Sequence, residues 1–191
     1  GQRTGAQNPH TRGGRRAHGP KVDKNWAQKM NSKERRRARD SAIAASSDPT
    51  LVSSRGHRFT EGTRFPIIID GYIENREGAE EKYDIEAIPL QYSTRKFVAI
   101  MEGLGLSGDL SRSKHGRSIR AGKGTMRGRK YRTPKSILIV VAQTGGLDKA
   151  ARNVPGVDVV TTKDLCAEDL APGGDLGRLT VWTKAAIEAL E

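Results

Sequence analysis

Glycine-rich segments are the first residues of this chain whose spacing could do chemistry, because glycine lets backbone amide groups approach a phosphate closely. The segment Gly103 to Gly108 (GLGLSG) matches the dinucleotide-binding pattern G-x-G-x-x-G. That pattern works where a strand precedes it and a helix begins after it. Here a helical pattern precedes the glycines and a polar, basic stretch follows. We therefore interpret Gly103 and Gly105 as residues that end a helix, and expect no nucleotide cofactor.

A second segment, Gly122-Lys123-Gly124-Thr125, resembles the phosphate loop of nucleoside triphosphatases. The pattern G-x-x-x-x-G-K-[ST] fails here, since Gly116 lies one residue too far upstream. Gly124 also stands where a serine or threonine should bind magnesium. The segment indicates contact with a phosphate backbone rather than a nucleotide site.

Side chains able to act as nucleophiles, acids or metal ligands form no set with the required spacing. The four histidines (His10, His18, His57 and His115) are scattered, and Cys166 is the single cysteine. No Ser-His-Asp or Cys-His arrangement can be placed from the sequence. An acidic cluster of Glu80, Glu81, Asp84 and Glu86 is better interpreted as solvated surface than as a site. We expect no enzyme activity, cofactor, metal or small-molecule substrate.

Charge is the strongest signal in the composition. The 191 residues carry a net charge of +12, with a pI near 10.1. Such a balance predicts a polyanionic partner, either nucleic acid or an anionic membrane. The longest apolar run, Ile137 to Ala142, is far shorter than the roughly 20 residues of a spanning helix. No secretory signal is visible, and a lone cysteine forms no internal disulfide. We therefore expect an intracellular protein that binds nucleic acid and no membrane.

The positive charge is concentrated in two segments. Residues 1–40 carry +9, residues 111–135 carry +10 with no acidic residue, and the rest of the chain carries −7. Blocks of like charge are often disordered tails, which stays open as an alternative. Trp26 and Tyr131 lie in these segments and could stack on exposed bases. The competing interpretation is that each ring packs against its own domain. For Trp26 both interpretations stay open, whereas for Tyr131 packing is favoured.

The pattern of apolar residues predicts an α/β fold with a mostly parallel sheet. Residues 1–28 have no apolar period and are expected to be extended, without a core. Short apolar runs alternate with amphipathic segments over the remainder, which is typical of parallel strands joined by helices. The expected strands are Phe65 to Asp70, Ser136 to Ala142, Val157 to Thr161 and Leu179 to Trp182. The expected helices are residues 31–45, Ser93 to Leu104, Leu147 to Asn153, Lys163 to Leu170 and Thr183 to Leu190.

The first expected helix has two faces of different character. Asn31 and Glu34 form a capping-box pattern at its start. Ala38, Ser41, Ala42 and Ala45 follow at i, i+3, i+4 and i+7, which predicts a narrow face packed on the body. Arg36 lies opposite, with Arg37 and Arg39 on the flanks, so the other face is expected to meet an anion.

Several segments together carry a resemblance to a known family. They are Gly13 to His18 (GGRRAH), Lys33 to Ala45 (KERRRARDSAIAA), Ser54 to His57 (SRGH), Ile119 to Pro134 (IRAGKGTMRGRKYRTP), Ala150 to Asn153 (AARN) and Glu168 to Thr183 (EDLAPGGDLGRLTVWT). In this order, over nearly the whole chain, the segments resemble the family of large-subunit ribosomal protein four. The lack of a long basic tail after the last helix resembles the archaeal form more than the eukaryotic one.

The resemblance implies a Rossmann-like three-layer α/β sandwich with an extended basic loop that helps to line the polypeptide exit tunnel. Residues 1–30 would be the returning arm of that loop, and residues 31–191 the globular domain with a basic insertion at 111–135. The family's first strand, first helix and outgoing arm would lie outside this sequence. The implied function is that of a cytoplasmic structural constituent of the large ribosomal subunit, which organises its rRNA during assembly. The implied partners are large-subunit rRNA, neighbouring ribosomal proteins and, near the loop tip, the nascent polypeptide.

The charge map and the resemblance point to the same candidate rRNA-binding residues. In the first basic segment they are Arg3, Arg12, Gly13, Gly14, Arg15, Arg16, His18, Lys21, Lys24, Trp26, Arg35, Arg36, Arg37 and Arg39. In the second they are Arg112, Lys114, Arg117, Arg120, Lys123, Arg127, Arg129, Lys130 and Arg132. Two rival functions remain: an RNA-modifying enzyme, which lacks a cofactor loop after a strand, and a regulatory nucleic-acid-binding protein acting off the ribosome, which lacks a recognised motif.

Overall fold

The computed structural model describes residues 4–5, 8–12, 18–76, 79–86 and 93–190 of the chain. Side chains are described for residues 18–71, 84–86 and 93–190. The chain forms two compact units, Gly1–Asn31 and Ser32–Glu191, which we describe separately.

The N-terminal unit contains a short antiparallel pair, β1 (Thr4–Gly5) and β2 (Asn8–Arg12). The apolar pattern did not predict these strands, because Pro9 is the one apolar residue among residues 8–12 and no alternation is present. Residues 18–31 form no helix or strand, and nearly all of their side chains are exposed. The prediction of an extended segment without a core is confirmed for residues 18–28.

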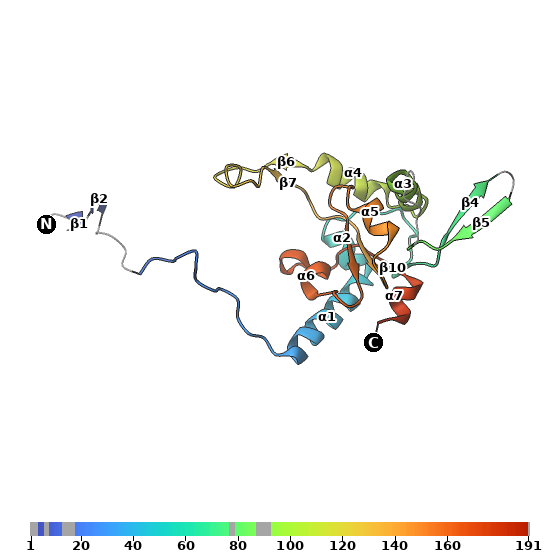
Figure 1. The fold of residues 1–191 in the computed structure, drawn as a ribbon, viewed down its shortest axis with the longest axis horizontal. Helices are drawn as coiled ribbons and strands as arrows, with labels where there is room; N and C mark the ends of the chain where they lie inside the picture. The colour runs from blue at the N-terminus through green and yellow to red at the C-terminus, as the bar shows by residue number, and fades with distance from the viewer. Residues whose placement is uncertain (1–3, 6–7, 13–17, 77–78, 87–92, 191) are drawn as a thin grey trace. The chain divides into compact units, whose positions relative to one another are not determined.

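The second unit is built on a four-stranded parallel sheet (Figure 1). Its strands are β3 (Ile67–Ile69), β8 (Leu138–Val141), β9 (Asp158–Thr161) and β10 (Thr180–Thr183). They lie in the order β3-β10-β8-β9, and every pair is parallel. The predicted α/β class with a mostly parallel sheet is confirmed, and each strand falls within a residue of its predicted segment.

Five helices occur where the sequence predicts them. They are α1 (Ser32–Ser46), α3 (Ser93–Gly103), α5 (Gly146–Ala151), α6 (Ala167–Leu170) and α7 (Lys184–Glu188). The helix expected over Lys163 to Leu170 is shorter than predicted, because α6 begins only at Ala167. A turn precedes it, in which the amide of Asp164 donates to the carbonyl of Thr161 and the Thr161 hydroxyl donates to the Asp164 carboxylate.

In the described part of the second unit, two α-helices and two hairpins were not predicted. They are α2 (Pro49–Ser54), α4 (Ser107–His115), the pair β4 (Tyr72–Arg76) and β5 (Ala79–Tyr83), and the pair β6 (Ser118–Ile119) and β7 (Tyr131–Arg132). Each is too short or too polar to show an apolar period. Helix α2 depends instead on a local cap, since the Asp48 carboxylate accepts from the Thr50 amide at 2.8 Å.

The GLGLSG segment joins two helices. Gly105 has a φ of +77°, the amide of Leu106 donates to the carbonyl of Met101, and the amide of Gly105 donates to that of Glu102. These are the bonds of a Schellman motif, which confirms that the glycines end α3. The polar, basic stretch after them forms a helix that was not predicted, since α4 begins at Ser107. The dinucleotide pattern still lacks its preceding strand.

Helices cover both faces of the sheet, and β8 shows why. Ile137, Ile139 and Val141 contribute to one buried cluster with α3, α4 and α5, whereas Leu138 and Val140 contribute to a second with α1, α6 and α7. Residues of a strand alternate between faces, so a strand buried on both sides is apolar throughout.

The order of the strands agrees with crossovers of a single hand. The connections from β3 to β8 and from β8 to β9 step in one direction, with α3, α4 and α5 on the first face. The connection from β9 to β10 steps back across β8, with α6 on the other face. When a crossover connection runs back across the sheet with the same handedness, its helix must lie on the opposite face.

Helix α1 is packed only at its C-terminal half. Ala42 and Ala45 are buried as predicted, but Ala38 and Ser41 are exposed. The prediction of a packed face starting at Ala38 is therefore wrong. The first two turns of α1 extend past the body, so that their whole circumference is accessible.

Candidate nucleic-acid interface

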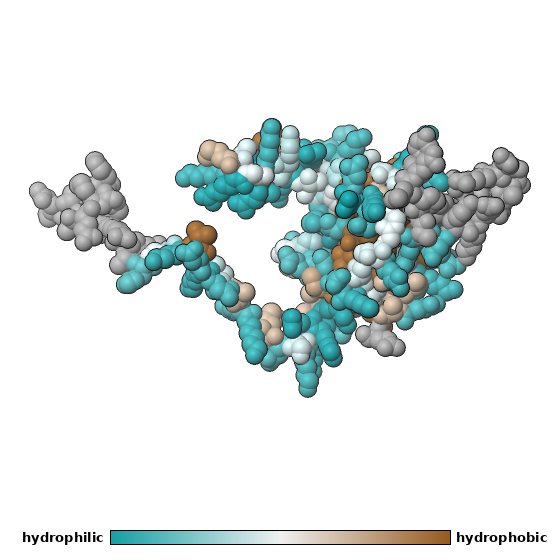
Figure 2. Space-filling view, viewed as in Figure 1, coloured by the Kyte–Doolittle hydropathy of each residue, from teal (hydrophilic) through white to brown (hydrophobic). Residues whose placement is uncertain are grey.

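The β6–β7 hairpin is the most basic element of the described chain. It projects from the body next to α4 (Figure 1), and its surface is largely hydrophilic (Figure 2). Ser118 pairs with Arg132 and Ile119 with Tyr131. The amide of Arg120 donates to the carbonyl of Lys130 at 2.8 Å, which extends the pairing by one residue.

The loop that closes this hairpin has a defined conformation of its own. The amide of Arg129 donates to the carbonyl of Gly124 at 2.9 Å, and the Thr125 hydroxyl donates to the carbonyl of Arg120 at 2.6 Å. Gly122 and Gly128 have φ values of +82° and +77°, which glycine adopts without strain. The alternative of a disordered basic tail therefore does not describe residues 117–132.

The cations of the hairpin, and Lys114 at the end of α4, point to solvent. All of the following are exposed: Lys114, Arg117, Arg120, Lys123, Arg127, Arg129, Lys130 and Arg132. Within the described part of the chain, no carboxylate forms an ion pair with any of them. A surface of this kind attracts polyanions.

Tyr131 contacts cations of the hairpin itself rather than the core. Its ring is 46% exposed, with the Arg117 guanidinium 4.1 Å and the Lys130 ammonium 5.5 Å from its centroid. In the N-terminal unit, Trp26 is 65% exposed, and the Lys24 ammonium lies 4.6 Å from its ring centroid. Both aromatic rings keep an open surface available for stacking.

The other candidates of the first basic segment divide into described and undescribed residues. His18 and Lys21 are exposed, as are Arg35, Arg36 and Arg37 on α1. Arg39 is less accessible, with 27% of its side chain exposed and its Nε 3.3 Å from Asp40 Oδ1. Arg3, Gly13, Gly14, Arg15 and Arg16 and the side chain of Arg12 lie outside the described residues.

Arg112 differs from the other candidates because its guanidinium faces inward. Its Nε lies 2.8 Å from Oδ1 of Asp109, and its Nη2 donates to the carbonyl of Lys135 at 2.7 Å. The side chain is only 21% exposed. Its contribution to RNA binding stays a prediction, and its hydrogen bonds give it a structural role that spacing did not reveal.

Asp109 is the centre of a buried polar cluster that anchors the hairpin. It accepts hydrogen bonds from Arg112 and from the Ser136 hydroxyl, the latter at 2.5 Å, and lies 3.1 Å from Nδ1 of His57. Burial raises the pKa of Asp109, but the hydrogen bonds from His57, Arg112 and Ser136 outweigh it and hold the pKa well below its usual range.

The serine, histidine and aspartate of this cluster do not form a catalytic triad. In a triad the histidine lies between the serine and the carboxylate. Here the carboxylate lies between the other two, and all three residues are buried. The cluster has no access to a substrate and is structural.

Arg178 makes a second buried connection to the same region. It is 1% exposed and donates to the carbonyls of Ser136 and Asp169 and to the Asp158 carboxylate. Lys135 also donates to Asp158, at 2.8 Å. Burial raises the pKa of Asp158, but hydrogen bonds from Lys135 and Arg178 lower it by more, so the pKa lies below its ordinary value. The segment that leads from the hairpin to β8 is thus fixed to the starts of β9 and β10.

Glu86 belongs to the acidic cluster interpreted as solvated surface, and for Glu86 that interpretation is wrong. Its carboxylate accepts from the amides of Ala142 and Gln143 and, at 2.6 Å, from the Thr183 hydroxyl. It thereby caps the ends of β8 and β10. These partners lie 56, 57 and 97 residues away, so no local signal identifies them. Asp84 is exposed, and the side chains of Glu80 and Glu81 lie outside the described residues.

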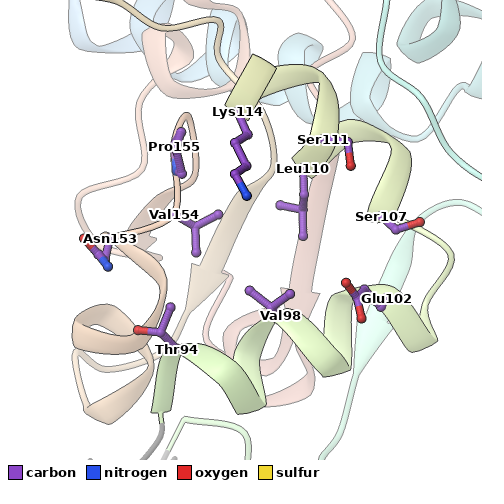
Figure 3. Close-up of a pocket in the computed structure, with 10 residues that line it drawn as sticks. All are labelled: Thr94, Val98, Glu102, Ser107, Leu110, Ser111, Lys114, Asn153, Val154 and Pro155. Carbon is purple, nitrogen blue, oxygen red and sulfur yellow. The ribbon is translucent and has the colours of Figure 1, made fainter. Parts of the chain in front are cut away.

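Two hollows flank the turn Asn153 to Pro155, which connects α5 to β9. The first, of about 310 Å³, is mainly apolar: the side chains of Val98, Leu110 and Val154 point toward one another, and Lys114 reaches over it from α4 (Figure 3). The second, of about 360 Å³, is polar and lies between this turn and the root of the β6–β7 hairpin. Its lining includes Arg117, Lys135 and Arg152.

The described residues contain neither a metal-binding cluster nor a membrane-spanning helix. No group of three or more histidine, cysteine, aspartate and glutamate side chains in those residues is arranged to hold a metal ion. None of the described helices is long and apolar enough to span a bilayer.

A parallel α/β body from which an exposed, acid-free basic hairpin projects defines a class of protein that binds polyanions through a projecting element. Comparison with known sequences assigns a family within that class: residues 2–191 match the Ribosomal protein L4/L1 family, and the chain belongs to it. This assignment confirms the predicted resemblance.

Curated relatives from archaea are similar over most of the chain. A protein of Methanocaldococcus jannaschii, named large ribosomal subunit protein uL4, is 48% identical over 186 residues, which are 97% of this chain and 68% of that protein. The protein of the same name from Halobacterium salinarum is 44% identical, over 96% of this chain and 68% of its own length. The predicted archaeal type is confirmed.

Proposed function

We propose that this chain is a structural constituent of the large ribosomal subunit that binds large-subunit rRNA. The observation that carries the proposal is the β6–β7 hairpin, an ordered element whose exposed cations have no carboxylate partner among the described residues. Membership of the family and the names of the archaeal relatives support the same function. They favour neither the RNA-modifying enzyme nor the off-ribosome regulator.

The physical basis of binding is the release of counterions from RNA when Lys and Arg side chains neutralise phosphates. The exposed cations of the hairpin and of the first turns of α1, together with the candidates in residues 1–30, would neutralise these phosphates. The hairpin is already ordered by its own hydrogen bonds, so binding costs it little conformational entropy. Residues 18–31 have no such framework, and fixing them costs about 1–2 kcal/mol per residue. Folded rRNA would therefore order the arm, whereas the hairpin would bind it as a preformed element.

We propose in addition a fold type, a role for the N-terminal arm, protein neighbours and a localisation. The sheet covered on both faces would be the Rossmann-like sandwich implied by the resemblance. Residues 1–30 would be the returning arm of the extended loop at the exit tunnel, near the nascent polypeptide. Neighbouring ribosomal proteins would contact the body in the assembled subunit, and the localisation would be that of the cytoplasmic ribosome.

Binding to a transcript of archaeal large-subunit rRNA tests the proposal. We expect the full chain to retain the transcript on a filter at moderate salt, with an affinity that falls steeply as salt rises. A small-subunit rRNA transcript of similar length is the control for unspecific binding. Equal affinity for both transcripts, or no sedimentation with reconstituted large subunits, would contradict the proposed function.

A further inference from the structure

The polar hollow at the root of the β6–β7 hairpin has the chemistry of a nucleotide site. Its walls include Arg117 and Tyr131 from the hairpin, Lys135 and Asp158 from the start of β8 and β9, and Arg152 and Asn153 after α5. We propose that it binds one unpaired ribonucleotide of the rRNA, with the phosphate on Arg152 and the base stacked against the Arg117–Tyr131 pair. This inference rests on the proposed function and specifies which form of RNA the hairpin recognises.

The charge of the hollow suits a phosphate. Arg117, Lys135 and Arg152 line it, and Asp158 is the one acidic residue of its lining. The Asp158 carboxylate is already bound by Lys135 and by the buried Arg178. Its charge is therefore compensated within the protein, and the two arginines leave the lining electropositive.

Arg152 and Asn153 have hydrogen-bonding groups to offer. Both side chains are exposed, and in the described part of the structure neither takes part in a hydrogen bond or ion pair. The two alanines that precede them, Ala150 and Ala151, are completely buried. The segment AARN thus fixes its first half in the core and presents its second half to the hollow. A guanidinium and an amide can together hold a phosphate and a base edge.

The Arg117–Tyr131 pair offers a surface for stacking. The guanidinium lies over the ring, 4.1 Å from its centroid, and both groups belong to the lining of the hollow. Bases stack on both aromatic rings and guanidinium planes, but only when they have left the double helix.

The shape of the hollow selects an unpaired nucleotide. Its volume of about 360 Å³ is in the size range of small-ligand sites, roughly 300–1,000 Å³. Its floor includes the buried Val157, and the Lys135–Asp158 ion pair holds one wall. A hollow of this size admits one extruded nucleotide but not a base pair. The apolar hollow on the other side of the Asn153–Pro155 turn has no comparable cationic lining (Figure 3).

Fluorescence of a short RNA tests the assignment. The probe is an RNA of about 12 nucleotides with 2-aminopurine at its centre, either single-stranded or annealed to its complement, added to the full chain. Charge density alone favours the duplex. We expect the opposite order, with tighter binding of the single strand and quenching of 2-aminopurine by stacking.

Variants locate the site. Arg152→Ala and Tyr131→Ala should each weaken single-strand binding by roughly tenfold, whereas Tyr131→Phe should retain it and the quenching. Lys163→Ala removes one exposed charge beyond the opposite end of β9 and should leave binding unchanged. Arg152→Ala lies outside the hairpin, so its effect cannot come from loss of hairpin structure.

Two results separate this inference from the proposed function. If the chain retains large-subunit rRNA but binds the duplex probe as well as the single strand, or if Arg152→Ala and Lys163→Ala behave alike, the nucleotide site is wrong and the proposed function stands. If large-subunit rRNA itself is not retained, the proposed function is wrong, and the inference fails with it.

Discussion

Nδ1 of His57 lies 3.1 Å from Oδ1 of Asp109, and both side chains are buried. The two residues are 52 positions apart, in the loop after α2 and in α4. Through Ser136 and Arg112, the same carboxylate also holds the start of β8 and the carbonyl of Lys135. One buried charge therefore connects three segments at the point where the basic hairpin leaves the body.

Replacing the buried carboxylate tests this connection. Asp109→Asn keeps the shape but loses the charge and puts a donor amide among the donors of Arg112 and Ser136. Removing one partner of a buried pair costs about 3–5 kcal/mol in the free energy of unfolding, which urea denaturation measures. Glu188→Gln, an exposed change on α7, should alter it by less than about 0.5 kcal/mol. Equal effects of the two changes would show that the cluster is not stabilising.

The same carboxylate predicts how stability depends on pH. Because hydrogen bonds hold the pKa of Asp109 below its ordinary value of 3.8, the folded protein binds this proton less readily than the unfolded chain. The stabilisation is therefore complete well above pH 3.8 and is lost as the pH falls through and below that value. Urea midpoints measured from pH 7 to pH 2 should change little for the parent chain down to about pH 5 and fall progressively below it. Asp109→Asn should show a shallower fall, since only groups such as Asp158 still contribute. Parallel curves for the two proteins would refute the assignment.

Two glycines with the same backbone conformation provide a matched pair. Gly156 and Gly122 have φ values of +80° and +82°. A Cβ at Gly156 would overlap the carbonyl oxygen of Pro134, whereas a Cβ at Gly122 would have no atom within 4 Å. Gly122→Ala should cost only the left-handed conformation, about 1–2 kcal/mol. Gly156→Ala should lower the thermal unfolding temperature further, because the start of β8 must move. A smaller effect at Gly156 than at Gly122 would contradict the close approach.

The salt dependence of rRNA binding should follow the charge of the hairpin. Replacing Arg129 and Lys130 together with alanine should weaken binding to large-subunit rRNA. The slope of log K against log salt should fall by about 1 for each phosphate that the variant no longer neutralises. The same direction is expected for alanine at Arg15 and Arg16, in the N-terminal segment.

Filter binding at several salt concentrations measures this slope. Arg95→Ala with Lys163→Ala removes two exposed charges elsewhere and serves as the control. An unchanged slope in the hairpin variant would mean that Arg129 and Lys130 do not bind phosphates.

The apolar pattern predicted the body of the fold well. The buried run around β8 and the alternation of strands with helices identified the parallel sheet, because strands covered on both faces must be apolar throughout. The pattern missed β6–β7 and α4. The hairpin depends on backbone hydrogen bonds and glycine turns, and α4 buries only one apolar side chain, Leu110, beside the Asp109 carboxylate, so neither element produces an apolar period.

The amino-acid sequence by itself determined the class of partner and the family, because net charge, its concentration in two segments and the order of motifs are properties of the chain. Only the tertiary structure decided the state of each cation. It turned Arg112 inward to the buried Asp109 and buried Arg178 against the partly exposed Asp158. It also left Arg152 free at the rim of a hollow and changed Glu86 from a surface acid to a cap on two strands. The physical reason is distance along the chain: the partners that decide whether a charge is buried or available are brought together only by folding.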